Sequence, residues 1–451
     1  MSLKNRVRRD EPAQQGDSGT PAGANAIADF RRQLLREADL DALARLDATQ
    51  LRARLERIAG NLLNREGPVI TAEQRTTLIR QIVDEMIGLG VLEPLLADET
   101  VTEIMVNGHD DIWVERGGRL MREEGMQFAS EAQLYQTIDR IVGGVNRRVD
   151  ESSPMVDARL PSGERVNVII PPLSLRGPAM TIRRFPTPYP MQRLVELDTL
   201  SPELADLLAG FVRAKLNVLV SGGTGTGKTT FLNALSAFIP ADERIITVED
   251  AAELQLQQPH VLSLESRPPN VEGRGEVTIR DLVRNALRMR PDRIIVGEVR
   301  GGETLDMLQA MNTGHEGSLA TVHANSPADA ILRLETLASM TELSISFDAL
   351  RDQINTAVEV FVQLGRATDG RRRVTEVAVV TSTHREQFRL ATVAEFVPDR
   401  VVHGGPSTGR YLYHGLPALY RERLHQRSLP IPAVFDRDLG ADHVLRVESS
   451  A

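Results

Sequence analysis

The amino-acid sequence predicts an α/β protein whose largest domain has a parallel β-sheet core covered by helices. From about residue 200 onward, apolar runs typical of strands alternate with segments whose apolar residues recur at helical spacing. The clearest strand, Asn217 to Val220, runs directly into a glycine cluster that precedes another helical segment. A chain of 451 residues has room for about two or three compact domains, so further domains are expected before this one.

The residues before this domain show two further patterns. Leu78, Ile82, Val83 and Met86 share one face of a helix, which is typical of a small helical bundle. After Pro94, short alternating strands surround one helical segment, which predicts an α+β domain. The expected segments are a disordered tail (1–25), a helical bundle (26–88), an α+β N-terminal domain (89–185), a proline-rich linker (186–199), the parallel-sheet domain (200–385) and a C-terminal extension of unknown role (386–451).

Composition excludes several classes of function. The 53 Lys and Arg residues against 62 Asp and Glu give a net charge of −9, and aromatic residues make up only 4% of the chain, and both facts argue against a nucleic-acid partner. The chain has no cysteine, which excludes disulfides, a thiol nucleophile and cysteine-ligated zinc. No apolar run approaches the roughly 20 residues of a membrane-spanning helix, and the first residues lack a secretory signal. We therefore expect a cytosolic protein that is able to dock on a membrane protein.

A glycine-rich segment between the strand and the next helix fits the phosphate-loop pattern of Gly, four residues, Gly, Lys and Thr. Its backbone N–H groups and the helix N-terminus suit a phosphate chain, with Lys228 on the β- and γ-phosphates and Thr229 on Mg²⁺. The alternative is that this segment is a glycine-rich turn that binds no ligand. The strand before it and the helix after it, which the phosphate-loop pattern requires, argue against that alternative. The expected ATP-binding residues are Gly222, Gly223, Thr224, Gly225, Thr226, Gly227, Lys228, Thr229 and Thr230.

Two further strands end in acidic residues. The strand from Ile245 runs into Glu249 and Asp250, and the strand from Ile294 runs into Glu298. Parallel sheets present ligand-binding groups at the carboxyl ends of their strands, so both ends can lie beside the phosphates. We expect Glu298 to polarise the attacking water, and Glu249 or Asp250 to act in the shell around Mg²⁺, with Glu249 preferred through a bound water. The alternative is that these acidic residues are solvent-exposed side chains in the turns that follow core strands.

Histidines and arginines are also candidates. His323 ends an expected strand downstream of Glu298 and could sense the γ-phosphate, whereas His315 lies between Gly314 and Gly317. Each histidine could equally serve packing or the surface. Arginine side chains match phosphate oxygens, but spacing does not reveal which of them act and which are solvated helix charges or ion-pair partners. The candidates are Arg267, Arg274, Arg280, Arg284, Arg288, Arg290, Arg293 and Arg300, together with Arg165, Arg183 and Arg184 of the α+β domain.

Taken together, the motifs resemble those of the motor ATPases of type II secretion, type IV pili and type IV conjugation. The matching blocks are the phosphate loop, the acidic block 246–250, the Gly-Glu strand 294–301 and the histidine block 314–325, within a resemblance over about 89–365. Within this superfamily the chain looks most like the tight-adherence (Flp/Cpa-type) pilus ATPases. That narrower resemblance comes from the helical start and from the segments 103–108, 147–155, 165–172 and 181–185, whereas the tail beyond about Arg385 departs from it.

This resemblance implies a RecA-like motor domain that binds ATP and Mg²⁺ in a homohexameric ring without zinc. Nucleotide would lie between the N-terminal and motor domains, and Arg165 and Arg183 would reach it across the subunit interface. The resemblance also raises the expectation that His323 is functional. Hydrolysis would change the angle between the domains around Pro186 to Pro190 and act on an inner-membrane platform protein. The chain would then work in the cytoplasm, at the face of the inner membrane.

Two rival functions share the phosphate loop. A nucleic-acid translocase or recombinase could use a similar ring, and DNA would then stimulate ATP turnover. A nucleotide-dependent scaffold or switch would bind ATP tightly with negligible turnover, and Glu298→Gln would leave it unchanged.

Overall fold

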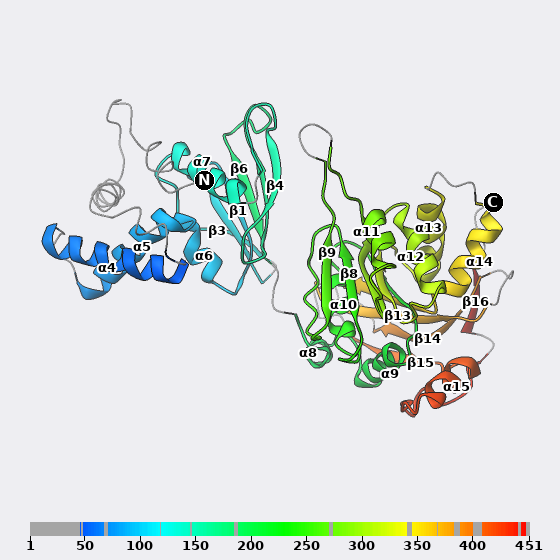
Figure 1. Ribbon diagram of the computed structural model, residues 1–451. Coiled ribbons are helices and arrows are strands. Elements are labelled where there is room, and N and C mark those ends of the chain that lie inside the picture. The colour runs from blue at the N-terminus through cyan, green and yellow to red at the C-terminus, as the bar shows by residue number, and fades with distance from the viewer. Residues whose placement is uncertain are drawn as a thin grey trace. The chain divides into compact units, whose positions relative to one another are not determined.

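The computed structural model describes residues 46, 48–66, 71–117, 119–144, 147–184, 188–269, 274–340, 345–367, 369–382, 388–399, 408–440 and 443–447. The chain divides into two compact units, residues 1–186 and residues 187–451 (Figure 1), and each is described by itself. The tail expected over 1–25 and the helical spacing expected before residue 46 lie outside the described residues.

The first unit begins with two helices, α4 (Ala48–Glu66) and α5 (Ala72–Ile87). A capping box starts α5, since Thr71 accepts from the N–H of Gln74 while the Gln74 side chain accepts from the N–H of Thr71. Leu62 and Val83 belong to a small apolar cluster formed by the two helices. A 3₁₀ turn (Gly90–Leu92) and the short helix α6 (Glu93–Ala97) lead into the sheet.

The rest of this unit is an antiparallel sheet with one long helix. The six strands lie in the order β3-β2-β1-β6-β5-β4. Their bounds are Val101–Asn107 (β1), Ile112–Arg116 (β2), Arg119–Arg122 (β3), Met155–Arg159 (β4), Arg165–Ile169 (β5) and Ala179–Arg183 (β6). Helix α7 (Glu131–Gly144) buries Leu134 and Ile138 against the sheet residues Ile104 and Val166. Strands with one covering helix are the α+β pattern expected from the sequence.

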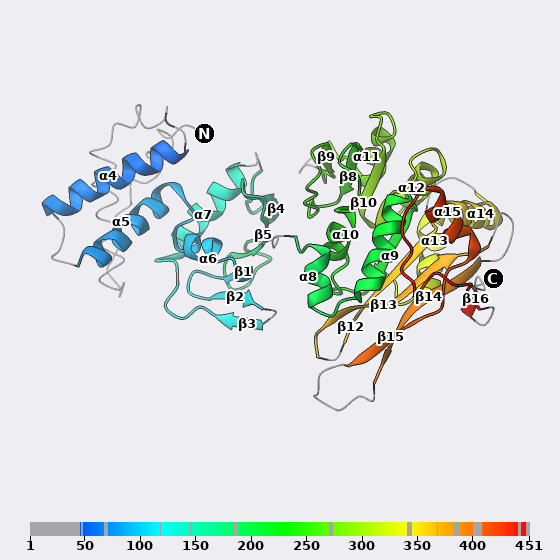
Figure 2. The ribbon, with the colours of Figure 1, turned by 90° about the horizontal axis from the view of Figure 1, so that it is seen from below.

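The second unit has one large mixed sheet. Its parallel part has the order β12-β7-β11-β10-β8-β9. The strands β13 (Arg372–Val380), β14 (Phe388–Pro398) and β15 (Gly409–Tyr413) extend it with antiparallel pairing (Figure 2). The parallel strands are β7 (Val218–Gly222), β8 (Ile245–Glu249), β9 (Val261–Glu265), β10 (Arg293–Val299), β11 (Leu319–Val322) and β12 (Val360–Arg366). The strand order changes direction at β7, the kind of position where an open α/β sheet binds its ligand. The predicted α/β class with a parallel, RecA-like core is confirmed.

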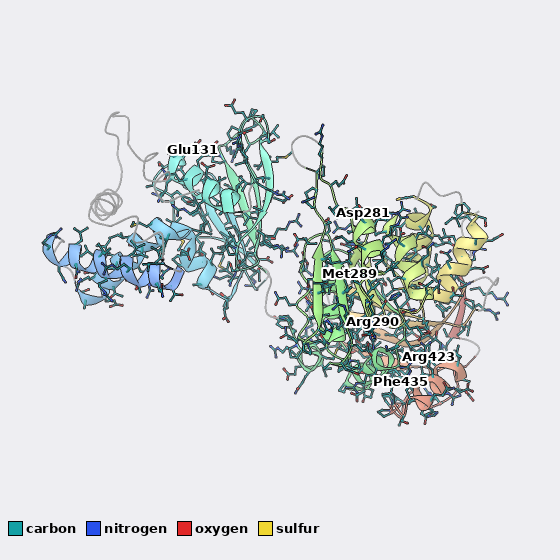
Figure 3. The ribbon with its side chains drawn as sticks, viewed as in Figure 1. Glu131, Asp281, Met289, Arg290, Arg423 and Phe435 are labelled. Carbon is teal, nitrogen blue, oxygen red and sulfur yellow. The ribbon has the colours of Figure 1, made fainter. Side chains whose placement is uncertain are left out.

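Helices cover both faces of this sheet. Helices α8 (Met191–Glu196), α9 (Pro202–Arg213) and α10 (Lys228–Ser236) pack against one face, where Val218 and Val220 are buried. On the other face Leu219 is buried against α11 (Ile279–Ala286), α12 (Glu303–Asn312), α13 (Pro327–Ser339) and α14 (Phe347–Ala357). A capping box starts α11, since the Thr278 side chain accepts from the N–H of Asp281 while the side chain of Asp281, which Figure 3 labels, accepts from the N–H of Thr278. The strands β7, β8, β10, β11 and β12 are therefore largely buried on both sides, as their apolar runs require, whereas the edge strand β9 is partly exposed.

Two segments contain structure that the sequence did not predict. The expected linker 186–199 contains helix α8 (Met191–Glu196), and Met191 and Leu194 are buried in the core. Proline at the N-cap fits a helix start, so the prolines limit the helix without preventing it.

The sheet also continues past the boundary expected at residue 385. After β13 (Arg372–Val380), the strands β14 (Phe388–Pro398), β15 (Gly409–Tyr413) and β16 (Val444–Val447) join it, together with α15 (Ala418–Gln426). Arg423 of α15, labelled with Phe435 in Figure 3, donates to the carbonyl of Lys215 at 3.0 Å. The described C-terminal residues are therefore part of the core of the second unit and not an appendage to it. Among the described residues, no helix is long and apolar enough to cross a membrane.

Candidate nucleotide site

The phosphate loop lies where β7 ends and α10 begins. Gly225 and Gly227 have φ values of 72° and 91°, which glycine adopts without strain. A Cβ atom on Gly222 would lie 2.6 Å from Thr226 Oγ1, so the close turn also needs glycine there. Thr226 Oγ1 donates to the Gly223 carbonyl at 2.9 Å and closes the loop. This cradle has the shape and the free N–H groups that a phosphate chain requires, and it ends at a helix N-terminus.

Lys228 lies inside the loop. Its Nζ donates to the carbonyls of Gly222 and Gly223 at 3.1 and 3.2 Å. Burial lowers the pKa of Lys228, the Arg300 charge lowers it further, and Glu298 acts in the opposite direction. Because burial disfavours the charged ammonium, a negative ligand beside it would stabilise the charge. Thr229 and Thr230 follow in the first turn of α10, partly exposed.

Glu298 and His323 meet next to this lysine. His323 Nε2 lies 2.7 Å from Glu298 Oε1, and Lys228 Nζ lies 3.3 and 3.4 Å from the two ring nitrogens of His323. Burial lowers the pKa of His323, the Lys228 charge lowers it further, and Glu298 opposes them. Glu298 Oε1 is buried and accepts no hydrogen bond among the described residues, so its close contact with His323 is not aligned as a hydrogen bond, whereas an unprotonated ring nitrogen of His323 can accept from Lys228. Two strand ends and the phosphate loop thus converge on one network.

Arg300 holds the other side of Glu298. Its Nη2 and Nε lie 2.6 and 3.0 Å from Glu298 Oε2, and its Nη1 lies 3.5 Å from Asp250 Oδ2. The pairing of β10 with β11 is irregular between Val296 and Val299, at the place where Glu298 stands. Sequence reasoning named Arg300 only among many arginines. Its position two residues after the strand-end acid was the signal that could have singled it out.

Glu249 occupies a different environment from Glu298. Its side chain is 2% exposed, and its Oε1 accepts from the N–H groups of Glu253 and Leu254 at 2.9 and 3.0 Å. Its Oε2 is buried without a hydrogen-bond partner among the described residues. Burial raises the pKa of Glu249 to about 7. A Cβ on Gly297 would lie 2.8 Å from Glu249 Cγ, which explains glycine at that position. The carboxyl group therefore orders the loop after β8, and its expected place near Mg²⁺ stays a prediction.

Comparison with known proteins identifies the family. Residues 85–397 match the family described as Type II/IV secretion system protein. A putative conjugal transfer protein of Mycobacterium tuberculosis is 42% identical over 329 residues, which cover 71% of this chain and 92% of that protein. The conjugal transfer protein TrbB of Rhizobium radiobacter is 32% identical and covers 67% of this chain and 91% of its own length. The chain belongs to the type II/IV secretion system protein family.

Among solved structures, the VirB11 ATPase of the Brucella suis type IV secretion system is 27% identical, with a TM-score of 0.36. The match covers 67% of this chain and 96% of that chain. The secretion-family membership predicted from the four motif blocks is confirmed. Together with the phosphate loop and the acid beside it, membership makes this secretion protein an ATPase.

The arginines of this secretion ATPase divide by their contacts. Arg293 is fully buried against Glu243, and Arg280 and Arg284 each lie 2.7 Å from Asp306, so these side chains hold the core and α11 together. Arg184 donates to the carbonyls of Asp98 and Val101, a structural role within the first unit.

Arg165 and Arg183 lie opposite each other on β5 and β6, and Arg165 also lies 3.6 Å from Asp157. They belong to the first unit, so their action on nucleotide stays a prediction. The carbonyl of His315 accepts from Ser318 at 2.8 Å, and its Nδ1 is buried without a hydrogen-bond partner among the described residues.

Proposed function

We propose that this chain is the ATP-driven motor of a pilus-assembly or secretion machine of the tight-adherence type. The observation that carries the proposal is the direct contact between the phosphate-loop lysine and the network of His323, Glu298 and Arg300. A loop that only held a phosphate group would not need an acid, a neutral imidazole and a second cation within contact of its lysine. Motor ATPases do need them, because binding has to be coupled to a reaction.

The residues would divide the work as follows. Lys228 exchanges its two carbonyl partners for phosphate oxygens, and the N–H groups of the loop hold the remaining oxygens. Glu298, held by His323 and Arg300, orients a water molecule and accepts its proton. His323 reports the occupancy of the loop to Glu298, since it contacts both. Thr229 is the residue that would hold Mg²⁺, with Glu249 or Asp250 acting through water. When bound, the ion would neutralise the charge of the β- and γ-phosphates.

Family membership supports a proposal about the partners. Relatives named as conjugal transfer proteins and as a type IV secretion system protein of Bordetella pertussis match most of their own length. We infer a homohexamer in the cytoplasm at the inner membrane, with Arg165 and Arg183 reaching the nucleotide of a neighbouring subunit. Movement of the two units about the segment after Arg184 would act on an inner-membrane platform protein.

The test begins with the purified chain and its Lys228→Ala variant. We expect the parent to release inorganic phosphate from ATP in the presence of Mg²⁺, and the variant to lose useful ATP binding or turnover while it unfolds at a similar temperature. Light scattering with a non-hydrolysable ATP analogue should then find an oligomer, and pull-down from the native host should recover the platform protein. A parent that releases no phosphate would remove the motor, and a monomer would remove the cross-subunit arginines.

A further inference from the structure

Two arginines face the phosphate loop from the side opposite Glu298. Strands β12 and β11 flank β7 on its two sides, and the antiparallel pair β12–β13 carries Arg366 and Arg372 opposite each other in register. A Cβ atom on Gly225 would lie 3.8 Å from Arg366 Nη1, and one on Gly227 would lie 3.3 Å from Arg372 Cδ. Both side chains are therefore within contact distance of the loop that takes the phosphates.

This arrangement is electrostatically unfavourable without a negative partner. Like charges directly opposite each other on an antiparallel pair destabilise it, and Lys228 and the N-terminus of α10 add positive charge nearby. Both arginines are exposed, and neither forms an ion pair with any acidic side chain in the part of the chain that the structure describes. Packing and ion pairing within the chain therefore do not explain why two guanidinium groups stand there.

The other arginines of the same segment have such explanations. Arg371 lies 3.3 Å from Asp198 and 3.5 Å from Asp369. Arg373 is buried with its guanidinium carbon 4.3 Å from the centre of the Phe396 ring. Arg371 and Arg373 thus have partners within the chain, whereas Arg366 and Arg372 lie at the phosphate loop. This difference indicates that Arg366 and Arg372 are not ordinary surface charges.

We propose that Arg366 and Arg372 bind phosphate oxygens of the nucleotide held in the phosphate loop, and so close the loop from the side away from the reacting water. The inference rests on the nucleotide site of the proposed function and adds to it two ligands from the same chain. A guanidinium group presents paired donors that match phosphate oxygens, which explains arginine in preference to lysine. The anion would also remove the repulsion between the two cations.

The test compares Arg366→Gln and Arg372→Gln with Arg371→Gln, the matched control that removes the same charge from the same segment. Affinities for ATP, ADP and adenosine are measured by titration calorimetry on the full chain. Each of the first two variants should bind ATP and ADP about tenfold more weakly, because one charge-assisted contact is lost. Adenosine binding and the control should be unchanged. Arg366→Lys should bind ATP more tightly than Arg366→Gln and less tightly than the parent, since lysine keeps the positive charge but lacks the paired donors of the guanidinium group.

Thermal unfolding without nucleotide separates binding from structure. Removing either cation should leave the melting temperature unchanged or raise it, because the repulsion across β12–β13 is relieved. The inference would be overturned if both variants bound ATP with the affinity of the parent. It would also be overturned if their affinity for adenosine fell as much as their affinity for ATP, or if a lowered melting temperature accounted for the weaker binding. A parent chain that binds no ATP would instead overturn the proposed function from which the inference starts.

Discussion

His323 lies against Glu298, with 2.7 Å between its Nε2 and Glu298 Oε1, and the same imidazole lies 3.3 Å from Lys228 Nζ. The three side chains come from α10, from β10 and from the residue that follows β11. Since β7, β11 and β10 are neighbours in the sheet, a change at the phosphate loop reaches the acid through one side chain. We propose that this contact couples the phosphate loop to Glu298.

Glu298→Gln should bind ATP and fail to hydrolyse it. The amide has the same shape as the carboxylate and can still contact Arg300 and His323, although more weakly. It does not accept a proton from water. We expect turnover to fall by at least about 100-fold, the usual contribution of a general base. Phosphate release measures turnover, and retention of labelled ATP measures binding. Asp348→Asn, which changes a highly exposed acid, is the control and should behave as the parent. Turnover at the parent rate would contradict the assignment of the base.

Glu249→Gln should change stability in a pH-dependent way. Glu249 has a pKa of about 7 in the folded chain against an ordinary value of 4.5. Between these values the folded state binds more protons than the unfolded state, so the parent loses stability as pH rises from 4.5 to 7. The neutral amide escapes this loss, and its carbonyl oxygen can still accept from Glu253 and Leu254. At pH 8 the variant should be more stable than the parent by roughly 1–3 kcal/mol, and near pH 4.5 the difference should vanish.

The measurement for Glu249 is the free energy of unfolding by urea at several pH values, with ATP turnover recorded beside it. An unchanged pH dependence would refute the buried, neutral state of this carboxyl group. A large fall in turnover without any gain in stability would instead favour the role beside Mg²⁺ that the sequence suggested.

Mixing two inactive variants should restore activity if arginines act between subunits. Arg165→Gln and Lys228→Ala should each be nearly inactive alone. In a mixed ring, an intact phosphate loop of the first variant can receive Arg165 from a neighbouring subunit of the second. Phosphate release from the mixture should therefore exceed the sum of the two separate samples. Arg159→Gln replaces the residue that pairs with Arg165 on β4 and serves as a control with parent-like turnover. A mixture as inactive as its components would exclude action across the interface.

DNA should not stimulate ATP turnover. The chain carries a net charge of −9 and an aromatic content of 4%, so its surface offers little for phosphate backbones or stacked bases. Turnover is measured with and without single- and double-stranded DNA at low salt, where electrostatic binding is strongest. A robust increase would favour the translocase over the motor of a pilus or secretion machine.

Local sequence was enough to predict the elements whose signals lie within a few residues. The alternation of strands and helices and the glycine spacing at 222–229 each depend on neighbours along the chain, and the structure contains them. Helix α8 was missed because three prolines suggested an extended linker, whereas burial of Met191 and Leu194 stabilises a short helix there. The C-terminal strands were missed because turn residues and charges interrupt their pattern, and pairing with β13 supplies the missing stability.

By itself the sequence determined which residues can carry chemistry: a phosphate loop, two strand ends with acids and a histidine after a third strand. Only the tertiary structure decided how they are arranged and what they contact. Glu249 and Asp250 are adjacent in the chain, yet Glu249 bonds to buried backbone N–H groups and Asp250 faces Arg300. Nothing in the local sequence distinguishes the roles of Arg300 and Arg366, yet Arg300 contacts Glu298 and Arg366 lies beside the phosphate loop. Such differences arise from sheet register and loop closure, which bring together residues far apart in the chain and which no local pattern encodes.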